Sequence, residues 1–285
     1  MIRVAILADI HGNSPALKAV IEHQRQFDTH LVIVAGDLIT DCPDSNEVVS
    51  MIASLENCMV IAGNREEYLR QFDGADQDEW RRRKQWSSFV WASDSLYKEN
   101  RTFLADLPTQ MSVQIGSSNL RIVHGSPNYS NDHLYPETKK IAKIMQEIPE
   151  GILVCGHTHE QWSTRLNGKI ALNPGSVGVH FNRDSNAEYS LLEFGGDHSQ
   201  VAIKHQQVPY DVEETISRFT KTGLIEHSPV WSHTIIQSLK TGKNITMEFL
   251  GKAIEMEKEI TGGEVIAISN NVWKKAAKEY LGITI

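Results

Sequence analysis

The chain has 285 residues, of which 40% are hydrophobic and 22% are charged, and its formal net charge is −8. This length suits one large domain or two modest ones, with enough apolar side chains for a sizeable core. The acidic balance argues against a general nucleic-acid binder, which would carry a basic surface. No apolar stretch is long enough to span a membrane, and three scattered cysteines do not make a disulfide framework. We therefore expect a cytoplasmic enzyme.

The N-terminal part alternates apolar runs with amphipathic segments. The runs at residues 4–8, 31–35 and 59–62 read as buried strands, and residues 16–26 and 46–55 read as helices between them. This βαβαβ order predicts parallel strands joined by right-handed crossovers.

A different pattern begins after Asn64. Residues 65–107 have no strand signal, so we expect a helical insertion there, with one long helix over residues 76–97. The simpler interpretation of its aromatic residues is that they form the core of the insertion. The alternative is that one Trp or Tyr edge lines a substrate pocket.

The rest of the chain is first β-like and then helical. Strands are expected at 111–115, 120–123, 152–155, 169–172, 189–194 and 201–207, with a helix at 138–147 and a turn at 195–197. Further helices are expected at 212–222, 230–239, 246–258 and 271–281. We therefore divide the chain into a domain at 1–209, which contains the insertion, and a helical C-terminal appendage at 210–285. The appendage could cover a sheet, form a homodimer contact or contribute to the pocket.

Polar motifs follow five of the apolar runs. They are Asp9-Ile10-His11, Gly36-Asp37, Gly63-Asn64, His124 and Gly156-His157-Thr158-His159. Each residue alone is a weak signal, but open α/β sheets place their ligands at the carboxyl ends of strands, so the ordered set should converge on one edge. Carboxylate, imidazole and amide ligands without a thiolate suit first-row transition metals and not a structural zinc site.

This order of motifs resembles the calcineurin-like metallophosphoesterase superfamily. The segments His124-Gly125-Ser126-Pro127 and Asn173-Pro174-Gly175 resemble its small bacterial and archaeal phosphodiesterase branch, which includes dinucleoside polyphosphate hydrolases. The resemblance spans about residues 1–210 and implies an α/β fold, an αββα double-sheet sandwich, here with a helical insertion and a helical C-terminal appendage. It also implies two divalent or trivalent metal ions, manganese or iron first, with zinc or nickel left open. One ion would take Asp9, His11, Asp37 and His159, and the other Asp37, Asn64, His124 and His157.

The resemblance implies a two-metal hydrolase. Two metals would share a water and lower its pKa, and the resulting hydroxide would attack phosphorus in line. Many members of the family carry His directly after Gly-Asn, where this chain has Arg65. Arginine cannot act as a general acid at neutral pH, but it can bind phosphate through a planar set of donors. We therefore assign catalytic roles to Asn64 and Arg65.

The missing acid bears on the substrate. Leaving groups that depart as stable anions should be favoured, so we expect phosphodiesters or phosphoanhydrides of nucleotide type, including dinucleoside polyphosphates. His133, Tyr135 and His180 are candidates for a surrogate acid or a substrate contact. The partner is a small phosphorylated substrate, without stable nucleic-acid binding or a membrane. The alternatives are a phosphomonoesterase, including a protein phosphatase, and a non-catalytic scaffold on the same fold.

Overall fold

Two five-stranded sheets form the centre of the molecule. The computed structural model describes residues 1–74, 76–195 and 200–285, so most of the turn expected at 195–197 lies outside the described residues. The first sheet has the order β10-β9-β1-β2-β3 and the second has the order β4-β5-β6-β8-β7. The strands of the first are β1 (Ile2–Leu7), β2 (Leu31–Val34), β3 (Cys58–Val60), β9 (Ala187–Phe194) and β10 (Val201–Val208). Those of the second are β4 (Gln110–Ile115), β5 (Ser118–Val123), β6 (Ile152–Val154), β7 (Gln161–Leu166) and β8 (Lys169–Pro174).

The parallel pairing predicted for the N-terminal part is confirmed. Strand β1 pairs in parallel with β2, with Val4 opposite Leu31, and β2 pairs in parallel with β3. In the second sheet β5 also pairs in parallel with β6, and β6 pairs in parallel with β8. Strand β7 was not expected, because its sequence is mostly polar and it pairs antiparallel with β8 at the edge of the sheet.

The alternation of side chains along β1 divides the core into layers. Val4 and Ile6 point between the sheets, where they pack with Ile122 and Leu172 of the second sheet. Ala5 and Leu7 point to the other face, where they pack against the first helices. A strand segment that is buried on both faces needs apolar residues at every position, which is why residues 4–7 of β1 show no polar alternation.

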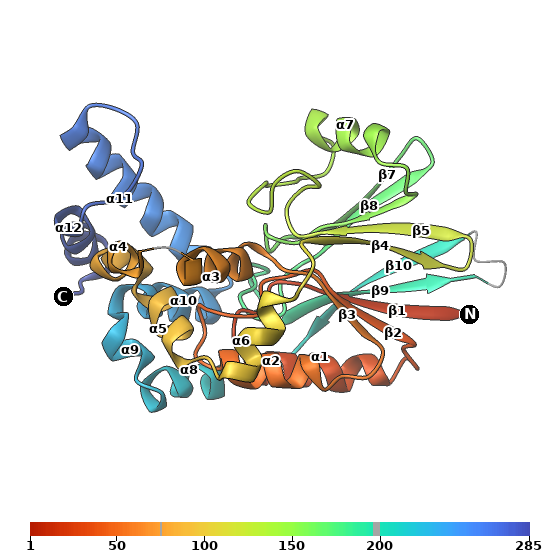
Figure 1. Ribbon diagram of the computed structural model, residues 1–285, viewed down its shortest axis with the longest axis horizontal. Helices are drawn as coiled ribbons and strands as arrows, with labels where there is room; N and C mark the ends of the chain where they lie inside the picture. Colours follow the sequence, from red (N-terminus) through yellow and green to blue (C-terminus); the bar gives the residue numbers. More distant parts are fainter. Residues whose placement is uncertain (75, 196–199) are drawn as a thin grey trace.

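Helices cover the outer face of each sheet (Figure 1). Helices α1 (Ser14–Arg25) and α2 (Ser45–Ala53) lie along the first sheet, and α7 (Lys139–Glu147) lies on the second. Helix α7 buries Ile141, Ile144 and Met145 against Leu153 and Ala171. The αββα sandwich is therefore confirmed.

The insertion is helical, but the single long helix expected at 76–97 is wrong. Its helices are α3 (Asn64–Gly74), α4 (Gln77–Arg82), α5 (Ser87–Ser95) and α6 (Lys98–Ala105), with a 3₁₀ turn η1 (Lys84–Trp86) between α4 and α5. Arg83 has extended backbone angles (φ −93°, ψ 114°) and ends α4. The break lets Trp80 and Trp86 meet with ring centroids 4.7 Å apart, beside Phe89. Burial of the aromatic rings thus outweighed continuous helix formation.

Five helices follow β10. They are α8 (Val212–Lys221), α9 (Leu224–His227), α10 (Pro229–Thr241), α11 (Ile245–Thr261) and α12 (Asn270–Leu281). They gather beside α3, α4 and α5 at the end of the sandwich opposite the N-terminus (Figure 1), and they have their own apolar cluster around Phe249 and Trp273. Within the described residues, no helix has the length and apolar character needed to cross a membrane. The division at residue 209 stays a prediction.

Candidate metal centre

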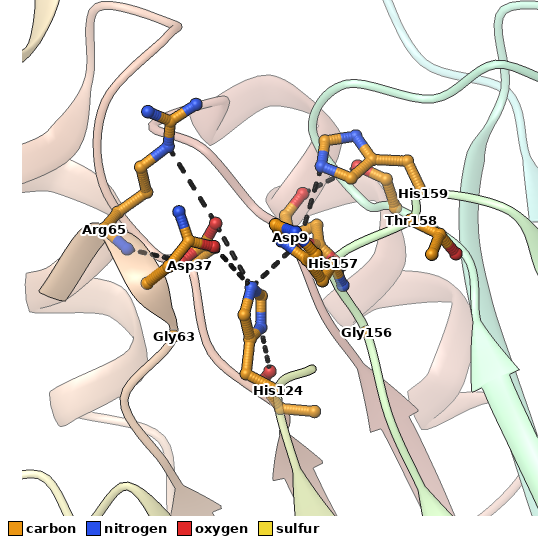
Figure 2. Close-up of polar contacts among 12 residues, drawn as sticks. Asp9, Asp37, Gly63, Arg65, His124, Gly156, His157, Thr158 and His159 are labelled. Atoms are coloured by element: carbon orange, nitrogen blue, oxygen red, sulfur yellow. Dashed lines mark hydrogen bonds and ion pairs between the residues drawn. The ribbon is translucent and has the colours of Figure 1, made fainter. Parts of the chain in front are cut away.

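The five motifs meet at the carboxyl ends of the central strands (Figure 2). The loops are hydrogen-bonded to one another: the Asp9 amide donates to the Gly36 carbonyl at 3.0 Å, and the Gly156 amide donates to the His124 carbonyl at 2.7 Å. The His157 amide donates to the Asp9 Oδ2 atom at 2.9 Å. The backbone therefore holds the loops together independently of any bound ion.

Several side chains of the site sit on left-handed backbone. The φ angles of Asp9, His11, Asp37, His157 and His159 lie between 49° and 68°. Residues with a Cβ atom adopt this region rarely and at an energetic cost, and such residues concentrate at functional sites. The surrounding hydrogen bonds impose these angles, which turn each side chain sharply from the end of its strand toward the common centre.

The site contains two adjacent clusters of potential metal ligands. Asp9, His11 and His159 form one, and Asp37, His124 and His157 form the other, with the ligand atoms of each cluster within 4.8 Å of one another. The clusters adjoin, since the His11 Nε2 atom lies 3.7 Å from both Asp9 Oδ1 and Asp37 Oδ2. Asn64 joins the second cluster, with its Oδ1 atom 3.0 Å from His124 Nε2.

Hydrogen bonds on the far side of two imidazoles fix which nitrogen faces the centre. The Nδ1–H of His124 donates to the Ala35 carbonyl at 2.7 Å, and that of His159 donates to the Val179 carbonyl. When these rings are neutral, each Nε2 atom presents a lone pair inward. The Nε2 atoms of His11 and His159 then face each other at 3.0 Å.

These inward atoms fit bound cations. Lone pairs and carboxylate oxygens repel one another at such distances unless a cation or a proton lies between them. Among the described residues, Asp9 Oδ1 and His157 Nε2 are buried and have no hydrogen-bond partner, which is unusual for polar atoms in a folded protein. Oxygen and imidazole ligands without a thiolate are the donor set of first-row transition metals.

The charges of the metal-free site agree with this interpretation. Burial lowers the pKa of His124, but the Asp37 and Asp9 carboxylates outweigh burial and raise it to about 10. Burial also opposes the charge on Asp37, yet the facing imidazoles hold its pKa below the usual range. Burial and the neighbouring His124 lower the pKa of His157 to about 3, so this ring is neutral and ready to bind a metal.

Asp41 belongs to the site, although no motif indicated it. Its Oδ2 atom lies 3.2 Å from His11 Nδ1 and accepts a hydrogen bond from Arg65 Nη2 at 3.0 Å. Its Oδ1 atom accepts a hydrogen bond from the indole of Trp231 at 2.7 Å. Burial raises the pKa of Asp41, but the Arg65 and His11 charges outweigh it and lower that pKa. The only sequence signal was its place four residues after Asp37.

Glu66 shapes the loops from beneath. This fully buried carboxylate accepts hydrogen bonds from the amides of Asp37, Leu38 and Gly63, at 3.0, 2.9 and 2.7 Å. Gly63 lies so close to Asp37 that a Cβ atom there would be 2.2 Å from Asp37 Oδ1. The loop before Asn64 therefore requires glycine. The Glu66 carboxylate takes the place of backbone carbonyls as the hydrogen-bond acceptor for the amides of these loops.

A cavity of about 330 Å³ opens over the two clusters. Arg65, His133 and Tyr135 line it, whereas His180 is fully buried outside its lining, with its Nε2 atom 3.0 Å from the Tyr210 hydroxyl. Figure 2 shows Arg65 on the Asp37 side of the site. Its Nη2 atom donates a hydrogen bond to the Asp41 carboxylate. The Arg65 side chain keeps 18% of its surface exposed, so its guanidinium is held in position by Asp41 and remains accessible from the cavity.

The C-terminal helices supply part of the cavity wall. Trp231 and Ile235 come from α10, and Asn244, Thr246 and Met247 come from the start of α11. Of the three roles left open for this region, a contribution to the pocket is therefore observed.

Comparison with known proteins agrees with the fold. An uncharacterized protein of Methanocaldococcus jannaschii is 25% identical over 241 residues, which is 78% of this chain and 94% of that protein. The structure of a metallophosphoesterase from Sphaerobacter thermophilus aligns with a TM-score of 0.69 and 22% identity, over 85% of this chain and 99% of that one. A hypothetical protein from Pyrococcus horikoshii aligns with a TM-score of 0.70 at the same identity and coverage.

The family is shown by the sequence itself. The calcineurin-like phosphoesterase superfamily domain matches residues 2–197, which covers both sheets except for β10 and contains every motif described above. Members of this family use divalent metal ions, and the two ligand clusters lie where such ions would be needed. The chain belongs to the calcineurin-like phosphoesterase superfamily and is a metal-dependent phosphoesterase.

Proposed function

We propose that this protein is a two-metal hydrolase of phosphodiesters or phosphoanhydrides, with nucleotide-type substrates such as dinucleoside polyphosphates. The observation that carries the proposal is the pair of adjacent clusters in which imidazole lone pairs and carboxylate oxygens face one another. One metal would be held by Asp9, His11, Asp37 and His159, and the other by Asp37, Asn64, His124 and His157. We expect manganese or iron as the bound metal from the family resemblance, and zinc or nickel would also fit these ligands.

The chemistry of hydrolysis divides between metal and protein. Bound metals would lower the pKa of a water to about 7 and neutralise phosphate oxygens. Asn64 adds a neutral oxygen and limits the negative charge of the site. Arg65 faces the cavity with a guanidinium that Asp41 orients, and its remaining donors can bind the phosphoryl oxygens as negative charge develops on them.

Substrate choice follows from the group beside Asn64. Arg65 cannot protonate a leaving group, because a guanidinium keeps its proton at neutral pH and the Asp41 and Asp37 carboxylates outweigh burial to raise its pKa further. Phosphoanhydrides and aryl esters need little protonation, whereas alkyl monoesters need much. His133 and Tyr135 line the cavity and remain candidates for a weaker acid, while the position of His180 gives that role no support.

A substrate panel tests this function. The Mn²⁺-loaded protein would be given aryl mono- and diesters, cyclic nucleotides, dinucleoside polyphosphates and an alkyl monoester, with product identification. We expect aryl diesters or dinucleoside polyphosphates to give the highest kcat/KM. Faster turnover of the alkyl monoester would contradict the proposal and favour a phosphomonoesterase.

The variant Arg65→Ala tests the role of the guanidinium. We expect bound Mn²⁺ to be retained and kcat to fall about 100-fold, the usual effect of removing one charge-stabilising donor. The control Arg83→Ala removes an arginine whose guanidinium pairs with Glu79 on the insertion, away from the cavity. Full activity in Arg65→Ala would contradict the proposal that the guanidinium stabilises the phosphoryl oxygens.

A further inference from the structure

A second cavity adjoins the metal centre. It has a volume of about 480 Å³ and shares Arg65, His157, Trp231 and Met247 with the first cavity, so the two are continuous. Its own lining is largely apolar, with Tyr68, Trp86, Leu250, Ile254, Ile266 and Ile268. We call this space the apolar groove.

The groove is formed by two segments far apart in the sequence. One wall comes from the insertion, through Tyr68 and Trp86, and the other comes from α11 and the segment after it. In Figure 1 these helices lie side by side at the end of the sandwich. Trp80 and Phe89 of the insertion pack on Trp86.

Hydrogen bonds connect the two walls at the far end of the groove. The Ile268 amide donates to the Gln85 side chain at 3.2 Å, and the Lys84 amide donates to Asn270 at 2.9 Å. The Asn270 side chain donates in turn to the Arg82 carbonyl at 2.7 Å. Hydrogen bonds therefore hold the two walls of the groove together, and the lining residues that it shares with the first cavity place it next to the metal centre.

The charge and exposure of the lining restrict what can bind. Among the described residues that line the groove there is no carboxylate, and the one permanent charge is Arg65 at the junction with the metal centre. Ile266 has 96% of its surface exposed, and Met247 has 55%. Apolar side chains in this position would be stabilised by a ligand that covers them.

We infer that the apolar groove binds a planar aromatic group of the substrate while its phosphate lies at the metal clusters. The inference rests on the proposed function, and it specifies the substrate class as phosphate compounds that carry an aromatic or heteroaromatic ring. Aromatic side chains on one wall and branched aliphatic side chains on the other suit a flat ring. Arg65, at the junction, is placed to pair with the phosphate of the same molecule.

Binding of inert phosphonates tests the groove without requiring turnover. The probes are methylphosphonate, phenylphosphonate and naphthylmethylphosphonate, titrated calorimetrically into the Mn²⁺-loaded full-length protein. All three present the same anionic head, so differences in Kd report the organic group. We expect affinity to rise by about tenfold or more from the methyl to the naphthylmethyl compound, from the apolar area buried.

A matched pair of variants tests whether the groove causes the preference for the aromatic probes. Ile266→Asp should abolish the preference for the aromatic probes and leave the Kd of methylphosphonate unchanged. Ile260→Asp is the control, because Ile260 is also exposed, at 69%, and does not line the groove. Both side chains are on the surface, so folding should be retained in both variants.

The outcomes separate this inference from the proposed function. Equal Kd values for all three probes would contradict binding of an aromatic group in the groove. The same preference for the aromatic probes in Ile266→Asp and Ile260→Asp would contradict it as well. A change in oligomeric state in Ile266→Asp with an unchanged preference would do the same, and would assign the surface to a second copy of the chain. A preference for the aromatic probes, without hydrolysis of any phosphate ester or phosphoanhydride, would support the groove and contradict the proposed function.

Discussion

Asp41 connects three parts of the site through one carboxylate. It faces His11 of the first cluster, holds the guanidinium of Arg65 and accepts the indole N–H of Trp231. The Asp41 carboxylate lies beside His11 Nδ1 at ion-pair distance without a hydrogen bond, so it acts on this imidazole through its charge. Asp41 is therefore a positioning residue, which acts on the reaction through His11 and Arg65.

The variant Asp41→Asn preserves the shape of the side chain and removes its charge. We expect the affinity for Mn²⁺ and the value of kcat to fall by about 10- to 100-fold, the usual effect of losing such a partner. Metal titration and steady-state kinetics measure the two quantities. Asp28→Asn is a suitable control, since the side chain of Asp28 is 92% exposed. Unchanged metal affinity in Asp41→Asn would show that the contact to His11 has no effect on the metal.

At the scale of elements, α10 joins the C-terminal helices to the metal centre. Trp231 stacks at 6.2 Å on Trp273 of α12, and its Nε1–H reaches Asp41. Packing in the C-terminal helices thus determines where the indole donor lies. Through Asp41, that packing bears on both the metal cluster and Arg65.

The variant Trp231→Phe tests this connection, because it keeps an aromatic ring and removes the donor. We expect metal affinity or kcat to fall about tenfold, as for the loss of one hydrogen bond to a charged group, with little change in the thermal unfolding temperature. The control is Trp162→Phe: Trp162 is buried, and its Nε1 atom has no hydrogen-bond partner among the described residues. Equal activity of the two variants would contradict a role for the indole donor.

At the scale of the whole molecule, protons and metal ions compete for the same centre. In the metal-free protein the pKa of His124 is raised to about 10 from an ordinary value of 6.5. The stability that this proton contributes is fully present below pH 6.5 and is lost as the pH rises through 10. A metal ion must displace that proton to bind the imidazole.

Metal binding should therefore release protons near pH 8. Calorimetric titration of Mn²⁺ in buffers with different ionisation enthalpies measures the release, and we expect about one proton or more per protein molecule. Chelation should lower the thermal unfolding temperature, because the metal binds only the folded site. Titration without proton release would show that His124 is already neutral in the metal-free protein.

The sequence by itself determined much of the fold and the place of the site. Continuous apolar runs such as residues 4–8 are typical of strands buried on both faces, and ligands that follow parallel strands of this kind are expected to meet at one edge of the sheet. That reasoning led to the parallel strands and to the residues that the structure now brings together, from Asp9 to His159. The double-sheet sandwich was implied by the resemblance of the motifs to the calcineurin-like phosphoesterases. Their assignment to individual metals stays a prediction.

Only the tertiary structure decided how the site is completed. Asp41, Glu66 and Trp231 lie in no motif, because their roles depend on contacts with residues distant in the sequence or on buried backbone amides. The apolar groove likewise exists only where the insertion meets α11. Local patterns record which face of an element is buried, but they carry no information about which distant element will cover it.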